Sequence, residues 1–372
     1  MAKNQKKQNV PWGIWVISVL IGLVCGLMTS NLLEQYDADA ILWVGLILFL
    51  GILASLTIST VIHEAGHLLF GLMTGYQFSS FRIFSFMWIK ENGKIRLKHH
   101  SVAGTAGQCL MTPPALNDGN YPVLLYNLGG VFTNLYTALC FFMLATLCSD
   151  LPIFSTLMYF FALQGLLFAL TNSIPFANNL LSNDGKNALM LTKSNTARRS
   201  FWLQLKINEL LSGGMRPKDI PEEWFAVPAD HEMKNPIVAT MGVIACSRLM
   251  DTHKFAEADA LMEHILQIDS GITGLHRNLL TCERIYVELI TENRWNTVQS
   301  MMTKELKDFM KTMKRSSTVL RTQYAYALLA ERDRITADRL MTQFEKRAKK
   351  SPYAGDVQSE RELMEIAREH FK

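Results

Sequence analysis

Two histidines and a glutamate lie close together in a mainly apolar stretch of the chain. Residues 60–70 read TVIHEAGHLLF, which places His63 and His67 four positions apart and Glu64 directly after the first histidine. Residues four apart share one face of an α-helix, so both imidazoles can bind a single zinc ion. The pattern predicts a catalytic zinc site in which His63 and His67 are ligands and Glu64 is the general base for a zinc-activated water.

The apolar surroundings favour this interpretation. A charged side chain in membrane hydrocarbon costs about 3 kcal/mol on insertion scales, so ionisable residues there are usually retained for function. The alternative is that His63 and His67 only form hydrogen bonds within a helical core. We prefer the zinc site because ionisable residues are nearly absent around the motif.

Four stretches are apolar and long enough to cross about 30 Å of hydrocarbon as helices. They are residues 12–33, 40–62, 122–148 and 152–172. Apolar residues continue after the second stretch, through the zinc motif, to Met73, which is too long for one perpendicular helix. This segment must tilt, protrude or break, and Gly51 is the obvious position for a break.

The charge distribution predicts the orientation of these helices. Lysines crowd the N-terminus, and basic residues crowd the connection between the second and third stretches, namely Arg82, Lys90, Lys94, Arg96 and Lys98. The other two connections carry acidic residues and no Lys or Arg. The positive-inside rule then places both termini and the catalytic end of the second helix in the cytoplasm. We expect a multi-pass protein of the cell membrane.

Composition divides the chain of 372 residues into two halves. Hydrophobic residues make up 49% of the whole and the net charge is only +4, but the long apolar runs lie before residue 195. We expect a transmembrane domain at 1–195, a linker at 196–234 and a soluble helical domain at 235–372. The expected fold class is an all-α membrane protein with a cytoplasmic α-helical domain.

A catalytic zinc site normally has three protein ligands, so the histidines need a third. Asp184 is the only acidic residue between Asp150 and residue 195. Pro175 follows the fourth apolar stretch and can break or kink the helix, so that the chain could turn toward the metal. The alternative is that Asp184 is a turn residue, because Asn-Asp-Gly favours turns.

Three motifs occur in order: HEAGH at 63–67, GGVFTN at 129–134, and NSIP at 172–175 followed by DG at 184–185. Over roughly residues 40–190 the chain thereby resembles the site-2 protease family of intramembrane zinc metalloproteases. The resemblance implies that Asp184 is the third zinc ligand and that Asn134 and Asn172 bind the substrate peptide. Two details depart from the family pattern. Nine positions separate Pro175 from Asp184, about one helical turn more than usual, and Asn183 stands where leucine is common.

Some of these residues have simpler interpretations. Buried asparagines such as Asn134 and Asn172 often only hold membrane helices together. Gly129 and Gly130 could serve only the close packing of two helices. The sequence leaves these alternatives open.

The resemblance implies an intramembrane zinc endopeptidase that cuts transmembrane or membrane-proximal peptides. Glu64 would accept a proton from the activated water and later pass it to the leaving amine. In a bacterium, the implied roles are regulated intramembrane proteolysis that releases a sigma-factor regulator, clearance of signal-peptide remnants, and maturation of a secreted peptide. The expected cofactor is zinc, and the expected partners are a transmembrane peptide or protein substrate and the lipid bilayer, with no nucleic acid.

A β-hairpin is expected between the second and third apolar stretches. Residues 81–90 and 94–98 alternate in polarity around an Asn92-Gly93 turn, which is a strong hairpin signal. Its aromatic side would lie in the membrane interface and its lysines in water. It could hold an unwound substrate as an added strand, or be a plain surface hairpin.

Paired amphipathic stretches predict helical hairpins in the C-terminal half. The pairs are 237–250 with 255–268, 276–291 with 296–313, and 318–331 with 337–349, before a final helix near 359–371. Units of about 40 residues resemble tetratricopeptide-type repeats, which bind a peptide or protein partner on a concave face. The alternative is a small helical domain that only packs against the enzyme.

Two other functions fit parts of the pattern. A membrane-anchored zincin would cleave exposed peptides with a glutamate as third ligand, for which Glu91 is the nearest candidate. A non-catalytic scaffold would bind partners through the helical repeats and keep a vestigial metal site. The intact Glu64 argues against the scaffold, because zinc binding alone does not require it.

Overall fold

The computed structural model describes residues 11–91, 93–102, 104–177 and 182–371. The chain divides into two compact units. The first, here called the apolar unit, comprises the described residues up to Phe84 together with Thr105–Lys193. The second, here called the polar unit, comprises Ser85–Gly104 together with the described residues from Ser194 onward. The chain thus leaves the apolar unit at Phe84, returns at Thr105 and leaves again after Lys193, two residues before the boundary expected from composition.

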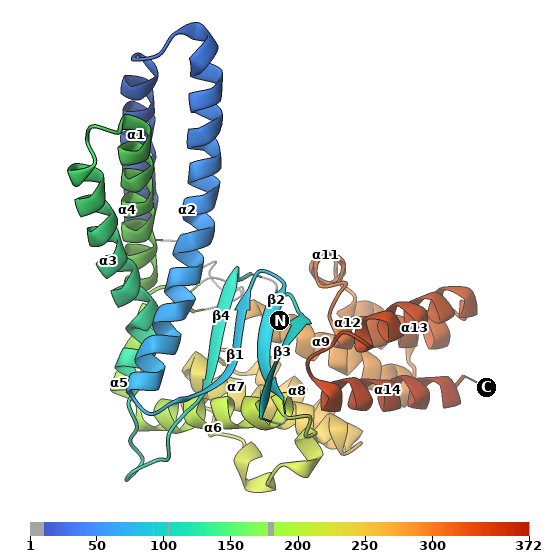
Figure 1. Ribbon diagram of the computed structural model, residues 1–372. Coiled ribbons are helices and arrows are strands. Elements are labelled where there is room, and N and C mark those ends of the chain that lie inside the picture. Colours follow the sequence, from blue (N-terminus) through green and yellow to red (C-terminus); the bar gives the residue numbers. More distant parts are fainter. Residues whose placement is uncertain (1–10, 92, 103, 178–181, 372) are drawn as a thin grey trace. The chain divides into compact units, whose positions relative to one another are not determined.

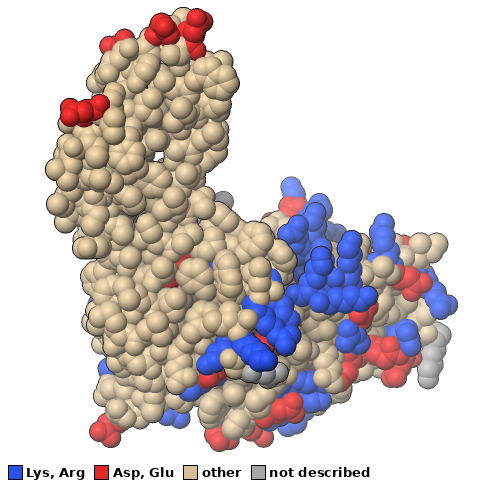
Figure 2. All heavy atoms as spheres, viewed as in Figure 1, with Lys and Arg blue, Asp and Glu red and all other residues tan. Residues whose placement is uncertain are grey.

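Four long helices dominate the apolar unit and pack side by side (Figure 1). They are α1 (Trp12–Leu33), α2 (Ala38–Met73), α3 (Leu124–Leu147) and α4 (Pro152–Ser173). Each is long and apolar enough to cross a membrane, which confirms the four apolar spans predicted from the sequence. On the face shown in Figure 2 their surface is almost free of charge, and acidic side chains lie at the upper end of the helices in this view. The unit therefore has the surface of a membrane-associated protein.

Helix α2 runs unbroken for 36 residues, a length of about 54 Å. Its N-cap residue is Asp37, whose side chain accepts a hydrogen bond from the Ala40 backbone N–H. Gly51 does not break the helix. A Cβ atom at Gly51 would collide with the Cδ2 atom of Leu157 on α4, so this glycine allows α2 and α4 to pack closely. The long helix carries the histidine motif near its C-terminal end.

Two strands of the apolar unit follow α2 and precede α3. They are β1 (Gln77–Ile83) and β4 (Gly107–Thr112), which pair antiparallel with Phe81 opposite Cys109. Arg82 is almost completely buried, and its guanidinium donates hydrogen bonds to the carbonyl oxygens of Phe84 and Gly107 at 2.7 and 3.3 Å. These bonds hold the start of β4 next to the end of β1. Neither the pairing of β1 with β4 nor the buried arginine was predicted from the sequence.

The predicted hairpin is present in the polar unit as β2 (Phe86–Glu91) and β3 (Lys94–His99). These strands pair antiparallel with Trp88 opposite Leu97. The single strand expected over 81–90 is wrong, because Phe84 adopts a positive φ of 52° and ends β1 before β2 begins. Gly93 also has a positive φ, as a tight turn requires, whereas Asn92 lies outside the described residues. Phe86, Trp88 and Leu97 are exposed on one face, which gives the hairpin the expected apolar side.

Helix α6 (Asn195–Ser212) occupies much of the predicted linker, and three short 3-10 turns follow it: η1 (Pro217–Asp219), η2 (Glu222–Phe225) and η3 (Glu232–Lys234). Eight α-helices then build the rest of the polar unit. They are α7 (Pro236–Asp251), α8 (Phe255–Gln267), α9 (Gly274–Ile290), α10 (Trp295–Met301), α11 (Lys304–Thr312), α12 (Ser317–Ala325), α13 (Arg334–Ala348) and α14 (Ala354–Glu369). A π-helical turn, η4 (Tyr326–Ala330), extends α12. A large shared hydrophobic core connects these helices.

Two of the predicted helix boundaries in the polar unit are wrong. The helix expected over 296–313 is split into α10 and α11, because the Thr303 side chain accepts a hydrogen bond from the Leu306 N–H and so caps a new helix. The final helix begins at Ala354, five residues before its expected start at 359. The paired arrangement of α7 with α8 and of α12 with α13 agrees with the predicted helical hairpins.

Candidate metal centre

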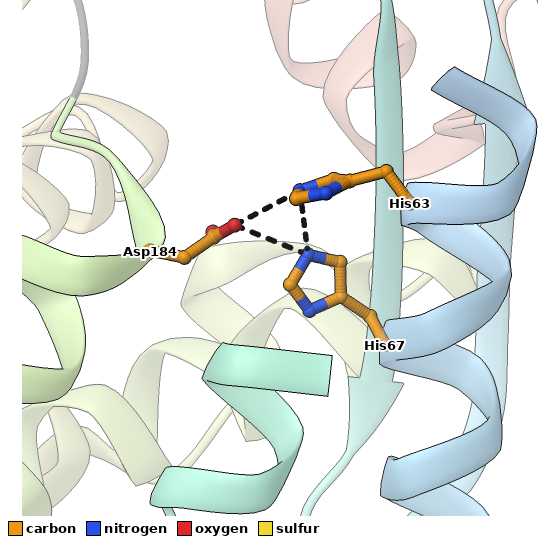
Figure 3. A group of neighbouring side chains, drawn as sticks. All are labelled: His63, His67 and Asp184. Carbon is orange, nitrogen blue, oxygen red and sulfur yellow. Dashed lines mark hydrogen bonds and ion pairs between the residues drawn. The ribbon is translucent and has the colours of Figure 1, made fainter. Parts of the chain in front are cut away.

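Helix α2 presents His63 and His67 on one face toward Asp184, at the start of α5 (Asp184–Lys193) (Figure 3). The Nε2 atom of His63 lies 2.9 Å from Oδ2 of Asp184. The Nε2 atom of His67 lies 3.4 Å from the same oxygen and 3.3 Å from Nε2 of His63. The three side chains predicted as ligands therefore converge, although Asp184 is more than a hundred residues away from the histidines in the sequence.

The separations of these donor atoms fit one metal ion. Four donors at about 2.0–2.1 Å from a tetrahedral metal lie about 3.3 Å from one another. The three observed separations are 2.9, 3.3 and 3.4 Å. Two imidazoles and a carboxylate are also common ligands of a catalytic divalent metal ion, and they leave a position for water. The group can hold a metal ion.

Asn183 fixes the start of α5 and thereby the position of Asp184. Its side-chain amide donates hydrogen bonds to the carbonyl oxygens of Thr171 and Ile174 at the end of α4, at 2.9 and 2.6 Å. Its side-chain oxygen accepts a hydrogen bond from the Lys186 backbone N–H at 3.0 Å, which caps the first turn of α5. In the sequence, Asn183 stands out only as a departure from a family pattern. The helix-capping preference of an asparagine three residues before Lys186 was the signal that could have found this role.

The histidine rings are held by helix α3. Nδ1 of His67 lies 2.7 Å from the carbonyl oxygen of Tyr126. Nδ1 of His63 lies 3.1 Å from the side-chain amide of Asn134, a residue with no exposed surface. In both rings Nδ1 is engaged by α3, while Nε2 faces the other ring and Asp184. Such contacts orient metal-binding histidines in other proteins.

Three glycines allow α2 and α3 to approach closely at this point. A Cβ atom on Gly129 would lie 2.5 Å from the carbonyl oxygen of Gly66, so these two residues form the helix crossing. A Cβ atom on Gly130 would lie 2.5–2.7 Å from atoms of the His63 ring. Gly129 therefore serves helix packing, whereas Gly130 makes room for the imidazole.

Glu64 is buried next to the first residue of β4. Its side chain is directly adjacent to Gly107, since a Cβ atom there would lie 2.5 Å from Oε1 of Glu64. The carboxylate is thus enclosed between α2 and the strand, and it is not one of the three converging donors. A residue in this position can exchange protons next to a metal without binding the metal itself.

The ionisation of Asp184 follows from its neighbours. Burial by itself raises the pKa of a carboxyl group, but the charge of His67 and the hydrogen bonds from His63 and His67 outweigh it and lower the pKa of Asp184 below its ordinary value of 3.8. Asp184 is therefore ionised at neutral pH, which is the form that binds a metal.

The remaining predicted residues make other contacts. The side-chain amide of Asn172 donates a hydrogen bond to the Phe168 carbonyl oxygen of its own helix, at 3.0 Å. Glu91, the alternative third ligand, forms ion pairs with Lys98 at 3.2 Å and with Arg96 at 3.7 Å. Binding of substrate by Asn134 or Asn172 stays a prediction.

Comparisons of the chain with family models, with curated proteins and with solved structures found no match. The function must therefore be argued from the side chains themselves. They form a His-His-Asp group able to hold a metal ion, beside a buried glutamate, in a unit with four candidate membrane-spanning helices.

Proposed function

We propose that this protein is an intramembrane zinc endopeptidase of the site-2 protease type, which hydrolyses peptide bonds in transmembrane or membrane-proximal segments. The observation that carries the proposal is the position of Glu64 on α2, adjacent in sequence to His63, whose Nε2 atom converges with His67 and Asp184. A structural metal site needs no such carboxylate, whereas hydrolysis needs a base for the attacking water. The apolar outer surface of α1–α4 supports a location within the membrane.

His63, His67 and Asp184 would hold the zinc ion, which supplies Lewis-acid activation of water and of the scissile carbonyl group. Glu64 accepts a proton from the attacking water at its carboxylate. It then passes this proton to the amine nitrogen that leaves when the peptide bond breaks. Gly107 and α2 enclose the carboxylate, which limits the access of bulk water to it.

Strand β4 supports an extended mode of substrate binding. It pairs with β1, and its first residue, Gly107, touches Glu64. A transmembrane helix hides its peptide bonds in its own hydrogen bonds, so it must unwind before cleavage. An unwound segment added alongside β4 would make backbone hydrogen bonds and bring a peptide bond to the catalytic glutamate.

The charge distribution supports an orientation with both termini in the cytoplasm. The helical hairpins of the polar unit support a tetratricopeptide-like fold that binds a peptide or protein partner. The biological roles that fit the site are regulated intramembrane proteolysis, removal of signal-peptide remnants and processing of a secreted peptide.

The test is the zinc content of the detergent-purified chain by elemental analysis, together with cleavage of a model transmembrane peptide by the same samples. Wild type should hold about one zinc ion per chain and cleave the peptide. Asp184→Asn should lose both zinc and cleavage, whereas Glu64→Gln should keep zinc and lose cleavage. Wild type without zinc, or normal cleavage by Glu64→Gln, would refute the proposal.

Glu91→Gln and Asp150→Asn are the matched controls. Both remove one carboxylate from a connection outside the metal group, and both should keep zinc and cleavage. Loss of zinc in Glu91→Gln with retention in Asp184→Asn would instead favour the membrane-anchored zincin.

A further inference from the structure

We propose that Asn134 is a positioning residue that accepts a hydrogen bond from the Nδ1–H group of His63 and thereby holds this ring in the tautomer that binds a metal through Nε2. The inference rests on the proposed metal site. Asn134 then orients the His63 ring and does not bind the substrate.

For His67, the contacts show which ring nitrogen carries the proton. Its Nδ1 atom lies 2.7 Å from the carbonyl oxygen of Tyr126, and a carbonyl oxygen can only accept a hydrogen bond. The Nδ1 atom of His67 must therefore carry the proton. The lone pair of a neutral His67 ring then lies on Nε2, which faces His63 and Asp184.

His63 needs the same tautomer, and the atom placed at its Nδ1 is the side-chain nitrogen of Asn134, 3.1 Å away. An asparagine side chain carries both an acceptor oxygen and a donor nitrogen, and the two have nearly the same shape. If the nitrogen faces the ring, Nδ1 must be unprotonated, and a neutral ring then carries its proton on Nε2, where the metal would bind. If the oxygen faces the ring, Nδ1 keeps the proton and Nε2 is free. Metal binding thus requires the Asn134 oxygen to face His63.

The burial of Asn134 supports this specific role. The residue has no exposed surface, and its side-chain oxygen has no hydrogen-bond partner among the described residues, so exchanging the positions of the amide oxygen and nitrogen would give this oxygen the His63 Nδ1–H as a donor. If a buried amide only joined two helices, both its oxygen and its nitrogen would be expected to form hydrogen bonds, because an unpartnered buried polar atom costs about 1–3 kcal/mol. Asn134 instead makes one side-chain hydrogen bond, and it makes it to the candidate ligand.

Helix α3 therefore orients both rings. Tyr126 and Asn134 lie eight residues apart on this helix, and each holds the Nδ1 atom of one histidine. Gly130 lies between them and leaves the space that the His63 ring fills. Loss of such supporting contacts typically weakens metal binding about 10- to 100-fold.

The test compares zinc affinity, measured by competition with a chelator, for the full chain in detergent. Asn134→Leu removes both acceptor and donor at similar size, and we expect its affinity to fall about 10- to 100-fold. Asn134→Asp removes the donor but keeps the acceptor, and we expect it to stay within about threefold of wild type. A merely structural role of the amide would make the two variants equally weak, so recovery in Asn134→Asp is the decisive readout.

Asn127→Leu is the matched control, because Asn127 is also buried on α3 but donates its hydrogen bond to the Val123 carbonyl oxygen of its own helix. This variant should bind zinc as wild type does. Equal weakening in Asn134→Asp and Asn134→Leu, or no weakening in either, would overturn the inference while wild type still binds zinc. A wild type that binds no zinc would overturn the proposed function itself, and the inference with it.

Discussion

Gly107 of β4 lies directly against Glu64 of α2, so closely that a Cβ atom on the glycine would be 2.5 Å from Oε1 of the glutamate. No real Cβ atom approaches another atom so closely, and the carboxylate must move if any side chain is added. Gly107 therefore leaves the space that the side chain of the proposed general base occupies.

Gly107→Ala tests this fit. We expect cleavage of a model transmembrane peptide to fall at least about 100-fold, because the base is displaced from the attacking water. Zinc content should stay at the wild-type level, since the ligand group is elsewhere. Gly45→Ala is the control, because a Cβ atom on Gly45 of α2, the helix that carries Glu64, meets nothing within 4 Å. Unchanged cleavage in Gly107→Ala would show that Glu64 tolerates displacement and is not the base.

Gly130→Ala, unlike Gly107→Ala, should weaken zinc binding. A Cβ atom there would lie 2.5 Å from Cε1 and 2.6 Å from Nδ1 of His63, so the ring must leave both Asn134 and the metal group. We expect zinc affinity to fall about 10- to 100-fold, with cleavage lost as a consequence. Chelator competition on the purified chain measures the affinity. Wild-type affinity would mean that His63 can move without loss of the metal.

Asn183→Ala should weaken metal binding from a distance. The side chain bonds to the carbonyl oxygens of Thr171 and Ile174 and to the N–H of Lys186, and without it both the end of α4 and the start of α5 lose their partners. We expect about a tenfold loss of zinc affinity, because Asp184 is the next residue. Asn187→Ala, one turn later on α5, should have no effect. Equal behaviour of the two variants would contradict the proposed role of Asn183.

Arg216 should be essential for the stability of the polar unit. Its guanidinium bonds to Asp251 at 3.0 and 2.5 Å and to Glu362 at 2.6 and 2.8 Å, and Asp251 is buried. Arg216→Met leaves that buried carboxylate without a counter-charge, which should cost about 3–5 kcal/mol of unfolding free energy. Arg361→Met breaks a partly exposed pair with Glu345 and should cost less than about 1 kcal/mol. Chemical unfolding of the detergent-solubilised chain measures both values, and similar costs would refute the distinction.

Asp356 should make the polar unit less stable as the pH rises. Burial, followed by the charges of Glu360 and Asp251, raises the pKa of Asp356 from 3.8 to about 7. The folded chain then holds a proton that the unfolded chain releases, so stability falls from about pH 4 to about pH 7 and is constant above. The shift corresponds to at most about 4 kcal/mol.

Asp356→Asn removes this titration. We expect a higher unfolding temperature than wild type at pH 8 and a smaller difference at pH 5, measured by calorimetry of the full chain in detergent. Asp338→Asn, at an exposed position of α13, should leave the wild-type pH dependence unchanged. Parallel pH curves for Asp356→Asn and wild type would show that Asp356 carries no buried proton.

The local parts of this structure could be predicted from the sequence, and the long-range parts could not. His63, Glu64 and His67 lie within one helical turn, so their spacing alone defines their geometry. The four apolar helices are long enough to be read from composition. Asp184 was singled out because it is the only acidic residue between Asp150 and residue 195, and by a family resemblance, since no local pattern tells which distant carboxylate meets the histidines.

The contacts that complete the site join segments far apart in the sequence. Gly107 carries no side chain whose type could mark its approach to Glu64, and Arg82 looks like a surface residue until β1 and β4 pair around it. In the polar unit, the hydrophobic pattern predicts one helix over 296–313. It does not reveal the cap formed by Thr303, which divides this segment into two helices. A single side-chain hydrogen bond can start a new helix in place of continuing the previous one, and the spacing of hydrophobic residues does not show where this happens.

The guanidinium of Arg82 joins the two ends of an excursion of the chain. The chain departs at Phe84 and returns at Thr105, and Arg82 bonds to the carbonyl oxygens of both, at 2.7 and 3.4 Å, while the Phe84 N–H bonds to the Ala106 carbonyl oxygen at 2.6 Å. These hydrogen bonds hold the two ends of the 85–104 segment close together. We therefore expect that residues 85–104 can be replaced by a short linker, or by the hairpin of another protein, without changing where β4 meets Glu64. Evolution and protein engineering would then have a position where one hairpin can be exchanged for another while the candidate site stays as it is.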